Sequence, residues 1–185
     1  MRIITGKAKG IRLITLEGDA TRPTSDRVKE AIFSMLQFDI EDRRVLDLFA
    51  GSGQLSLEAL SRGAKEAVLV DKSKDAMRII KSNIEKTKLD GATVFCMPSD
   101  EYIRRFSGEK FDIIFLDPPY ASGLYAPSLR ALCEADMLKS STLIVCESDT
   151  EAIFGKDKEL CEKFEAVKVS RYSKTVISIL SPAKK

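Results

Sequence analysis

Between residues 45 and 146, short apolar runs alternate with segments of helical periodicity. The strand-like runs are residues 45–49, 67–70, 93–97, 111–116 and 142–146. The helical patterns lie between them, at residues 53–61, 73–86, 100–106 and 125–135. Nearly continuous apolar strands separated by single helices are typical of βαβ units, in which a parallel sheet is buried on both faces. The alternation therefore predicts an α/β fold.

The C-terminal part of the chain breaks this alternation. Residues 166–170 and 175–180 are strand-like, and only residues 171–174 separate them. A connection this short is typical of an antiparallel hairpin. Together with the strands before it, this hairpin predicts a mostly parallel, seven-stranded sheet with an antiparallel C-terminal end.

The N-terminal part of the chain precedes the first βαβ unit. Residues 1–20 alternate weakly in hydropathy, which fits a β-hairpin or a loose strand pair. Thr24 or Ser25 can then cap an amphipathic helix. We expect an N-terminal β-hairpin extension at residues 1–22 and a single domain at residues 23–185.

The residue types that are missing restrict the chemistry. The chain has no histidine, which excludes Ser-His-Asp and Cys-His nucleophilic schemes and histidine metal sites. The cysteines show no Cys-x-x-Cys pair, so we expect buried, reduced thiols of a cytoplasmic protein and neither disulfides nor a metal site. These cysteines are Cys96, Cys133, Cys146 and Cys161. The sequence contains no run of about 18 apolar residues, so we expect no membrane span.

Basic residues gather at both ends of the chain, although the net charge is only +2. Residues 1–16 contain Arg2, Lys7, Lys9 and Arg12 and no acidic residue, and residues 166–185 are also basic without an acid. Such segments are either solubilising surface or a basic rim that neutralises nucleic-acid phosphates.

The segment Asp47-Leu48-Phe49-Ala50-Gly51-Ser52-Gly53 follows the first predicted strand and opens a helix. Its two glycines allow a tight turn and a close approach of the backbone to a ligand. A dinucleotide-binding loop would need a third glycine where Ser56 stands, and no nucleoside-triphosphate loop is present. The carboxylate of Asp47 suits the cationic S-adenosylmethionine better than a pyrophosphate.

Two further acids follow the next strands. Asp71 ends the second predicted strand, where a carboxylate can accept hydrogen bonds from both ribose hydroxyls. Asp100 follows the third strand, and it either meets the adenine amine or caps the next helix.

The tetrapeptide Asp117-Pro118-Pro119-Tyr120 directly follows the fourth predicted strand. The two prolines fix φ and remove two backbone donors, so the loop offers a carboxylate and carbonyl oxygens as acceptors. An exocyclic NH2 group is a donor that Asp117 and the Pro118 carbonyl can hold, while Tyr120 stacks on the base. We therefore expect transfer of a methyl group to an exocyclic nitrogen, a reaction that relies on positioning and needs no histidine.

Taken together, these motifs resemble the RsmD family of class I, Rossmann-like methyltransferases. The resemblance extends over nearly the whole chain, including Arg2-Ile3-Ile4, the segment from Thr21 to Phe33, and Glu58-Ala59-Leu60-Ser61-Arg62-Gly63-Ala64. It implies methylation of the N2 amine of a guanine in bacterial small-subunit (16S) ribosomal RNA, and so a role in ribosome biogenesis. One departure is Asp71, where the family usually has glutamate.

The resemblance also implies which residues form the site. Asp117, Pro118, Pro119 and Tyr120 are expected at the target base. The cofactor-binding residues are expected to be Asp47, Phe49, Ala50, Gly51, Ser52, Gly53, Asp71, Lys72, Ser99, Asp100 and Thr24. The expected RNA-binding residues are Arg2, Lys7, Lys9, Arg12, Arg22 and Arg27. The expected partner of this monomer is ribosomal RNA, free or in an assembling small subunit.

Two alternatives remain open from the residues alone. An adenine-N6 nucleic-acid methyltransferase or a protein glutamine N-methyltransferase also holds a planar NH2 group, so the tetrapeptide does not separate these substrates. The other alternative is a non-catalytic RNA-binding module with a degenerate cofactor pocket, which predicts loss of Asp117 or of the glycines, and all of these residues are present.

Overall fold

The computed structural model describes residues 1–16, 25–119, 122–154 and 157–184. Its strands are β1 (Arg44–Asp47), β2 (Glu66–Asp71), β3 (Ala92–Cys96), β4 (Phe111–Leu116), β5 (Leu138–Ser148), β6 (Phe164–Tyr172) and β7 (Thr175–Pro182). Its helices are α1 (Asp26–Met35), α2 (Gln54–Ser61), α3 (Lys74–Thr87), α4 (Ser99–Arg105), α5 (Tyr125–Glu134) and α6 (Lys158–Lys163).

One seven-stranded sheet organises the molecule, in the order β3-β2-β1-β4-β5-β7-β6. Strands β1 to β5 pair in parallel, whereas β7 pairs antiparallel with both β5 and β6. The predicted α/β class, the strand number and the antiparallel C-terminal hairpin are all confirmed. The chain runs outward from β1 to β3 and then returns to place β4 on the other side of β1. Such a reversal of strand order is where open α/β sheets bind ligands.

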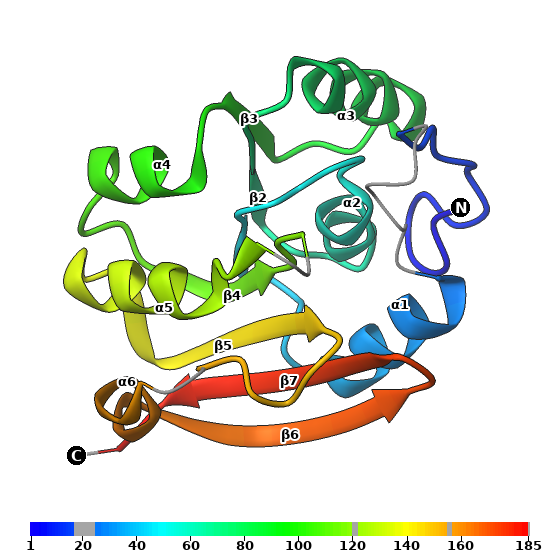
Figure 1. Ribbon diagram of the computed structural model, residues 1–185. Helices are drawn as coiled ribbons and strands as arrows, with labels where there is room; N and C mark the ends of the chain where they lie inside the picture. The colour runs from blue at the N-terminus through cyan, green and yellow to red at the C-terminus, as the bar shows by residue number, and fades with distance from the viewer. Residues whose placement is uncertain (17–24, 120–121, 155–156, 185) are drawn as a thin grey trace.

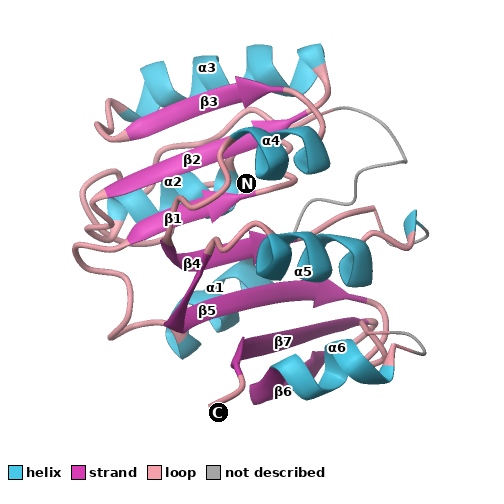
Figure 2. Ribbon diagram, turned by 90° about the vertical axis from the view of Figure 1, so that its left-hand side faces the viewer, coloured by secondary structure: helices cyan, strands magenta, loops and turns pink. Residues whose placement is uncertain are grey.

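The sheet separates two hydrophobic cores, with helices on both of its faces (Figures 1 and 2). One core joins α1, α2 and α3 to the sheet through side chains such as Phe33, Leu57 and Ile80. The other joins α4, α5 and α6 to the opposite face through Tyr102, Leu129 and Leu160. Ile3 and Leu13 of the N-terminal segment belong to the first core, so this segment packs on the α1–α3 face alone.

The N-terminal strand pair is loose, one helix was not expected, and the expected burial of the cysteines needs correction. The N-terminal segment forms the looser of the two expected arrangements. An antiparallel bridge joins Arg2 to Arg12, and the amides of Ile3 and Leu13 donate to the carbonyls of Ile11 and Met1 at 2.9 and 3.1 Å. Helix α6 was not predicted, since its six residues bury only Leu160 and show no helical period. Cys146 is the one fully buried cysteine. Cys96 is exposed because β3 is an edge strand. Cys133 is partly buried, and Cys161 is exposed.

A buried ion pair joins α1, α2 and the N-terminal segment. The Lys29 ammonium lies 3.2 Å from the Glu58 carboxylate, and both side chains are fully buried. Glu58 also accepts hydrogen bonds from the amides of Ile4 and Thr5, at 2.8 and 3.0 Å, and from Arg62 at 2.8 Å. Lys29 in turn donates to the carbonyl of Arg2. Burial lowers the pKa of Lys29, and the Glu58 charge opposes this shift.

We predict that Glu58→Ala lowers the free energy of unfolding by about 3–5 kcal/mol, because it leaves Lys29 buried without its counter-charge. The matched control is Glu151→Ala, which removes the exposed pair with Arg171 and should cost less than about 1 kcal/mol. Urea unfolding of the three proteins measures both values. Equal losses in the two variants would contradict the structural role of Glu58.

Candidate active site

Carboxylates end neighbouring strands at one edge of the sheet. Asp47 is the last residue of β1 and Asp71 the last of β2, and Asp117 directly follows β4. The register places Asp47 beside Leu69 on one side and Phe115 on the other. Since β1 lies between β2 and β4, the three acids gather where the strand order reverses.

The loop between β1 and α2 depends on two left-handed glycines. Gly51 has φ +55° and Gly53, the N-cap of α2, has φ +77°. A Cβ atom on Gly53 would lie 3.0 Å from Leu69, so the loop also packs closely against β2. Ala50 is buried, while Phe49 and Ser52 are partly exposed. Gly51 is partly exposed, and a Cβ atom on it would meet nothing within 4 Å, whereas Gly53 is buried. The backbone therefore reaches the surface at Gly51.

Asp71 is fixed by two backbone amides. Its carboxylate oxygens accept hydrogen bonds from Gly51 at 2.9 Å and from Ser73 at 2.8 Å. The first bond holds the glycine loop, and the second holds the start of α3. Lys72 between them is exposed. A partly exposed carboxylate oriented in this way fits a ribose diol.

The structure gives less support to the expected contact between Asp100 and the adenine of the cofactor. Asp100 is exposed and forms a salt bridge of 2.9 Å with Arg104 along α4. The N-cap of α4 is Pro98, not Asp100, and Ser99 begins the helix. An adenine contact by Asp100 would have to compete with Arg104, and it stays a prediction.

Asp47 is the buried acid of the site. It is 2% exposed, and its Oδ2 accepts a hydrogen bond of 3.0 Å from the Ser56 hydroxyl. Burial raises the pKa of Asp47 to about 7; the Ser56 and Phe49 hydrogen bonds act against this shift, and the charge of Asp71 adds to it. A cation beside Asp47 would favour the ionised carboxylate.

Asp117 lies beside a further acid that the sequence reading missed. The β4–β5 register pairs Leu116 with Cys146, so Asp117 and Glu147 are the next residues along two adjacent strands. Burial, followed by the charges of Glu147 and Asp47, raises the pKa of Asp117 well above its ordinary value. The available signal was the position of Glu147, which follows an apolar strand just as Asp47 and Asp71 end theirs.

The remainder of the tetrapeptide is partly described. Pro118 is buried and Pro119 is exposed. The carbonyl of Pro119 accepts a hydrogen bond of 2.8 Å from Ser122. Tyr120 lies outside the described residues, as do Thr24 and Arg22. The helix cap that could have been either Thr24 or Ser25 is Ser25, whose hydroxyl accepts from Val28.

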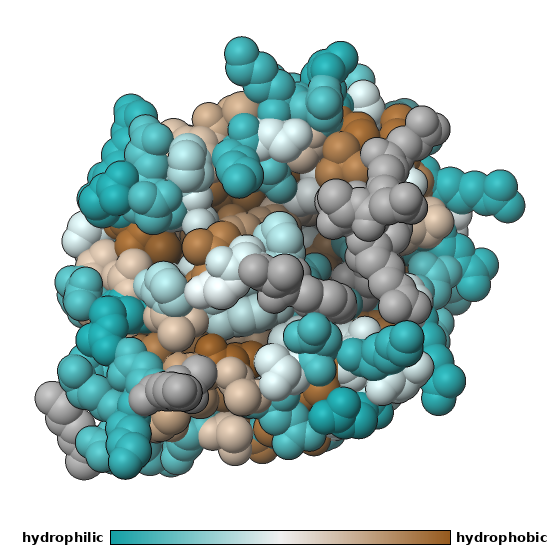
Figure 3. Space-filling model, in the orientation of Figure 1, coloured by the Kyte–Doolittle hydropathy of each residue, from teal (hydrophilic) through white to brown (hydrophobic). Residues whose placement is uncertain are grey.

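Among the described residues, the predicted RNA-binding side chains are exposed; Arg22 lies outside them. Figure 3 shows hydrophilic side chains around the rim of the molecule and apolar ones nearer the middle. Arg2 pairs with Asp26 at 3.7 Å. The Lys7 amide donates to Ser61 at the C-terminal end of α2, which is the end far from the glycine loop. The other exposed members of the set are Lys9, Arg12 and Arg27.

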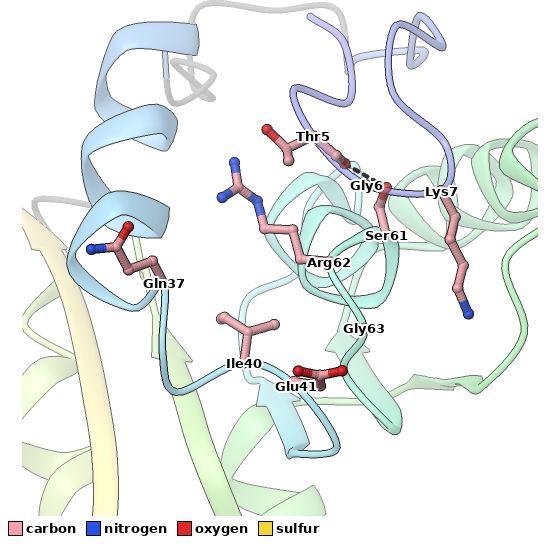
Figure 4. A pocket seen from close by; sticks show the side chains of 9 residues that line it. All are labelled: Thr5, Gly6, Lys7, Gln37, Ile40, Glu41, Ser61, Arg62 and Gly63. Carbon is pink, nitrogen blue, oxygen red and sulfur yellow. Dashed lines mark hydrogen bonds between the residues drawn. The ribbon is translucent and has the colours of Figure 1, made fainter.

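Beside Lys7 the surface is hollowed between the N-terminal segment, α2 and the turn after α1. The hollow measures about 660 Å³ and is open to solvent. It is lined by Thr5, Gly6, Lys7, Gln37, Ile40, Glu41, Ser61, Arg62 and Gly63 (Figure 4). Because it lies at the C-terminal end of α2, this hollow is separate from the strand ends that carry Asp47 and Asp117.

Two absences apply to the part of the chain that the structure describes. In these residues, no three or more cysteine or acidic side chains come together in a group that could hold a metal ion. None of its helices is long and apolar enough to cross a membrane.

Comparison with known proteins decides the family. The model of the family described as "Conserved hypothetical protein 95" matches residues 1–181. The chain belongs to this family. Relatives in the same family include the "Ribosomal RNA small subunit methyltransferase D" of Haemophilus influenzae, 37% identical over 163 residues that cover 86% of this chain and 81% of the relative. The resemblance read from the sequence motifs, to the RsmD family, is confirmed.

A second relative and a solved structure agree with this assignment. A Bacillus subtilis protein named "Putative rRNA methyltransferase YlbH" is 40% identical over 154 residues, which cover 82% of this chain and 84% of the relative. The solved structure described as "Putative methyltransferase yhhF from Escherichia coli" is 28% identical with a TM-score of 0.84, and the match covers 100% of this chain and 99% of that one. That structure thus has the same fold over the whole of this chain.

We predict that Asp47→Asn reduces the loss of stability as pH rises. Asp47 has a pKa of about 7 when folded against 3.8 ordinarily, so the folded chain keeps a proton that the unfolded chain has lost. The contribution of the Asp47 carboxyl group to the free energy of unfolding is therefore greatest below about pH 4, and it is lost as pH rises toward 7. Between pH 5 and pH 8, urea unfolding should show a loss about 2–3 kcal/mol smaller in the variant than in the wild type.

The matched control is Asp75→Asn, which removes an exposed carboxylate on α3. It should leave the pH dependence of unfolding nearly unchanged. The same pH slope in Asp47→Asn and the wild type would show that the Asp47 carboxyl is not held protonated by burial.

Proposed function

We propose that this protein transfers a methyl group from S-adenosylmethionine to the exocyclic N2 amine of a guanine in small-subunit ribosomal RNA. The observation that carries the proposal is the position of Asp117 beside Asp47 and the glycine loop, on adjacent strands at the reversal of strand order. A donor loop and an acceptor loop side by side are what group transfer between two bound molecules requires.

The residues at this edge fit S-adenosylmethionine. Asp71 offers a carboxylate, oriented by Gly51 and Ser73, to the ribose hydroxyls. The backbone of Gly51 and Gly53 allows close approach, and the acidic surroundings of Asp47 suit a positively charged ligand. The bound cofactor supplies a methyl group that is already activated by positive sulfur.

Asp117 is proposed to hold the amine and to accept its proton. Its carboxylate and the Pro118 carbonyl receive the two N–H groups, which directs the nitrogen lone pair toward the methyl group. As the N–C bond forms, the bond between the methyl group and sulfur breaks and its electron pair stays on sulfur. The nitrogen becomes positively charged and loses one proton. The raised pKa of Asp117, caused by burial and then by the neighbouring acids, makes its ionised carboxylate a stronger base for that proton.

The choice of RNA rests on the relatives and on charge. The named relatives are ribosomal RNA methyltransferases, and the N-terminal segment exposes Lys7, Lys9 and Arg12 toward solvent. We further propose that the enzyme works in the cytoplasm as a monomer without a metal ion, on RNA that an assembling small subunit presents. Guanine N2 is preferred to adenine N6 through the resemblance of the whole chain.

A transfer assay with tritiated S-adenosylmethionine tests the substrate. The acceptors are ribosomal RNA, small ribosomal subunits from cells lacking this protein, DNA and a protein mixture. We expect label in the RNA or the subunits, and N2-methylguanosine after digestion. Label confined to DNA or protein would overturn the RNA assignment, and N6-methyladenosine would overturn the choice of base.

We predict that Asp117→Ala lowers kcat at least about a hundredfold, because the amine loses both its acceptor and its base. The affinity for S-adenosylhomocysteine, measured by calorimetry, should change by less than about threefold. The matched control is Asp136→Asn, which removes an exposed acid before the start of β5, at the opposite end of the strand from Glu147. Asparagine tolerates the left-handed φ of this position, and both values should stay unchanged. Equal losses of turnover and cofactor affinity in Asp117→Ala would show that this residue mainly binds the cofactor.

A further inference from the structure

One buried amide side chain connects the glycine loop to the N-terminal segment. Asn83 lies on α3 and is fully buried. Its Nδ2 donates to the carbonyl of Ser52 at 2.9 Å and to the carbonyl of Ile14 at 2.9 Å. Its Oδ1 accepts from the Ile14 amide at 2.8 Å. Both donor hydrogens and the acceptor oxygen are therefore used, across sequence separations of 31 and 69 residues.

The two partners of Asn83 belong to different parts of the proposed site. Ser52 lies between the two left-handed glycines of the cofactor loop. Ile14 belongs to the N-terminal segment, whose exposed basic side chains are the proposed RNA contacts. Helix α3, which carries Asn83, is itself bound to the site at its start, because Asp71 accepts from both Ser73 and Gly51. A shift of Ser52 or of Ile14 must therefore stretch hydrogen bonds at the same buried amide.

We infer that Asn83 is a positioning residue that couples cofactor binding to RNA binding. The inference rests on the proposed function, since it takes the N-terminal segment as an RNA-binding surface. A cofactor that restrains the glycine loop also restrains Ile14 through Asn83, so less freedom is left for RNA to remove. Each ligand then tightens the other by the same factor, because linkage between two binding equilibria is reciprocal.

A merely structural Asn83 would behave differently. In that case its replacement would lower stability and would weaken the two ligands independently, without changing the effect of one on the other. The coupling factor therefore separates the two roles, whereas a loss of stability does not. Lys86 provides the matched control, because it lies on the same helix and donates to the Arg12 carbonyl at 3.4 Å without contacting the glycine loop.

The experiment measures the affinity for S-adenosylhomocysteine by calorimetry, with and without small ribosomal subunits from cells lacking this protein. For the wild type we expect tightening by about fivefold or more in the presence of subunits. In Asn83→Ala this factor should fall below about twofold, and in Lys86→Ala it should stay as in the wild type. An unchanged factor in Asn83→Ala, or no tightening in the wild type, would overturn the coupling.

A second measurement needs no variant and no RNA. Hydrogen exchange of the wild-type protein follows the Ile14 amide, which is bound to Asn83, and the Lys7 amide, which is bound to Ser61 at 2.8 Å. S-adenosylhomocysteine alone should slow exchange at Ile14 and leave Lys7 unchanged. No change at Ile14, or an equal change at both amides, would overturn the role of Asn83 even if Asn83→Ala does not fold.

The two measurements also keep this inference apart from the proposed function. A protein that protects Ile14 on binding S-adenosylhomocysteine but never methylates ribosomal RNA would refute the proposed substrate and support the connection through Asn83. Methylation of ribosomal RNA without protection of Ile14 would do the reverse.

Discussion

The arrangement of α1, α2 and the N-terminal segment depends on the contacts of one buried carboxylate, that of Glu58. Four groups from three parts of the chain meet it: the Lys29 ammonium, the Arg62 guanidinium and two amides of the N-terminal segment. A fully buried carboxylate is costly unless each lone pair is used. This requirement fixes where α1 lies against α2, and it holds the N-terminal segment on the same face as the glycine loop.

The sheet could be predicted from the sequence because its strands are buried on both faces, and apolar runs between helical patterns have few other solutions. Helix α6 could not, since it is short and has only Leu160 in the core. The N-terminal strand pair is present only in its loose form, and Ile3 and Leu13 belong to the core on the face of α1, α2 and α3. The prediction that Cys96 is buried was wrong, because β3 is an edge strand.

The candidate site was predictable where function and strand ends coincide. Asp47, Asp71 and Asp117 follow apolar runs, so their meeting at one edge follows from the parallel sheet. Asn83 was not predictable, because its partners are backbone atoms of Ile14 and Ser52, which carry no signature in the sequence. Glu147 was overlooked although it follows the same rule as the other acids.

The buried acids also change the charge that the folded chain presents. The net charge of +2 counts every carboxyl group as ionised. The pKa of Asp47 is raised to about 7 by burial, so this carboxyl group holds a proton more readily than an exposed acid does. The pKa of Asp117 is also raised, by burial and by the charges of Glu147 and Asp47. The folded chain is thus more cationic than its composition states, which favours a polyanion such as RNA. A cation bound beside Asp47 would favour the ionised carboxylate, so binding of a positive charge there is linked to the release of a proton.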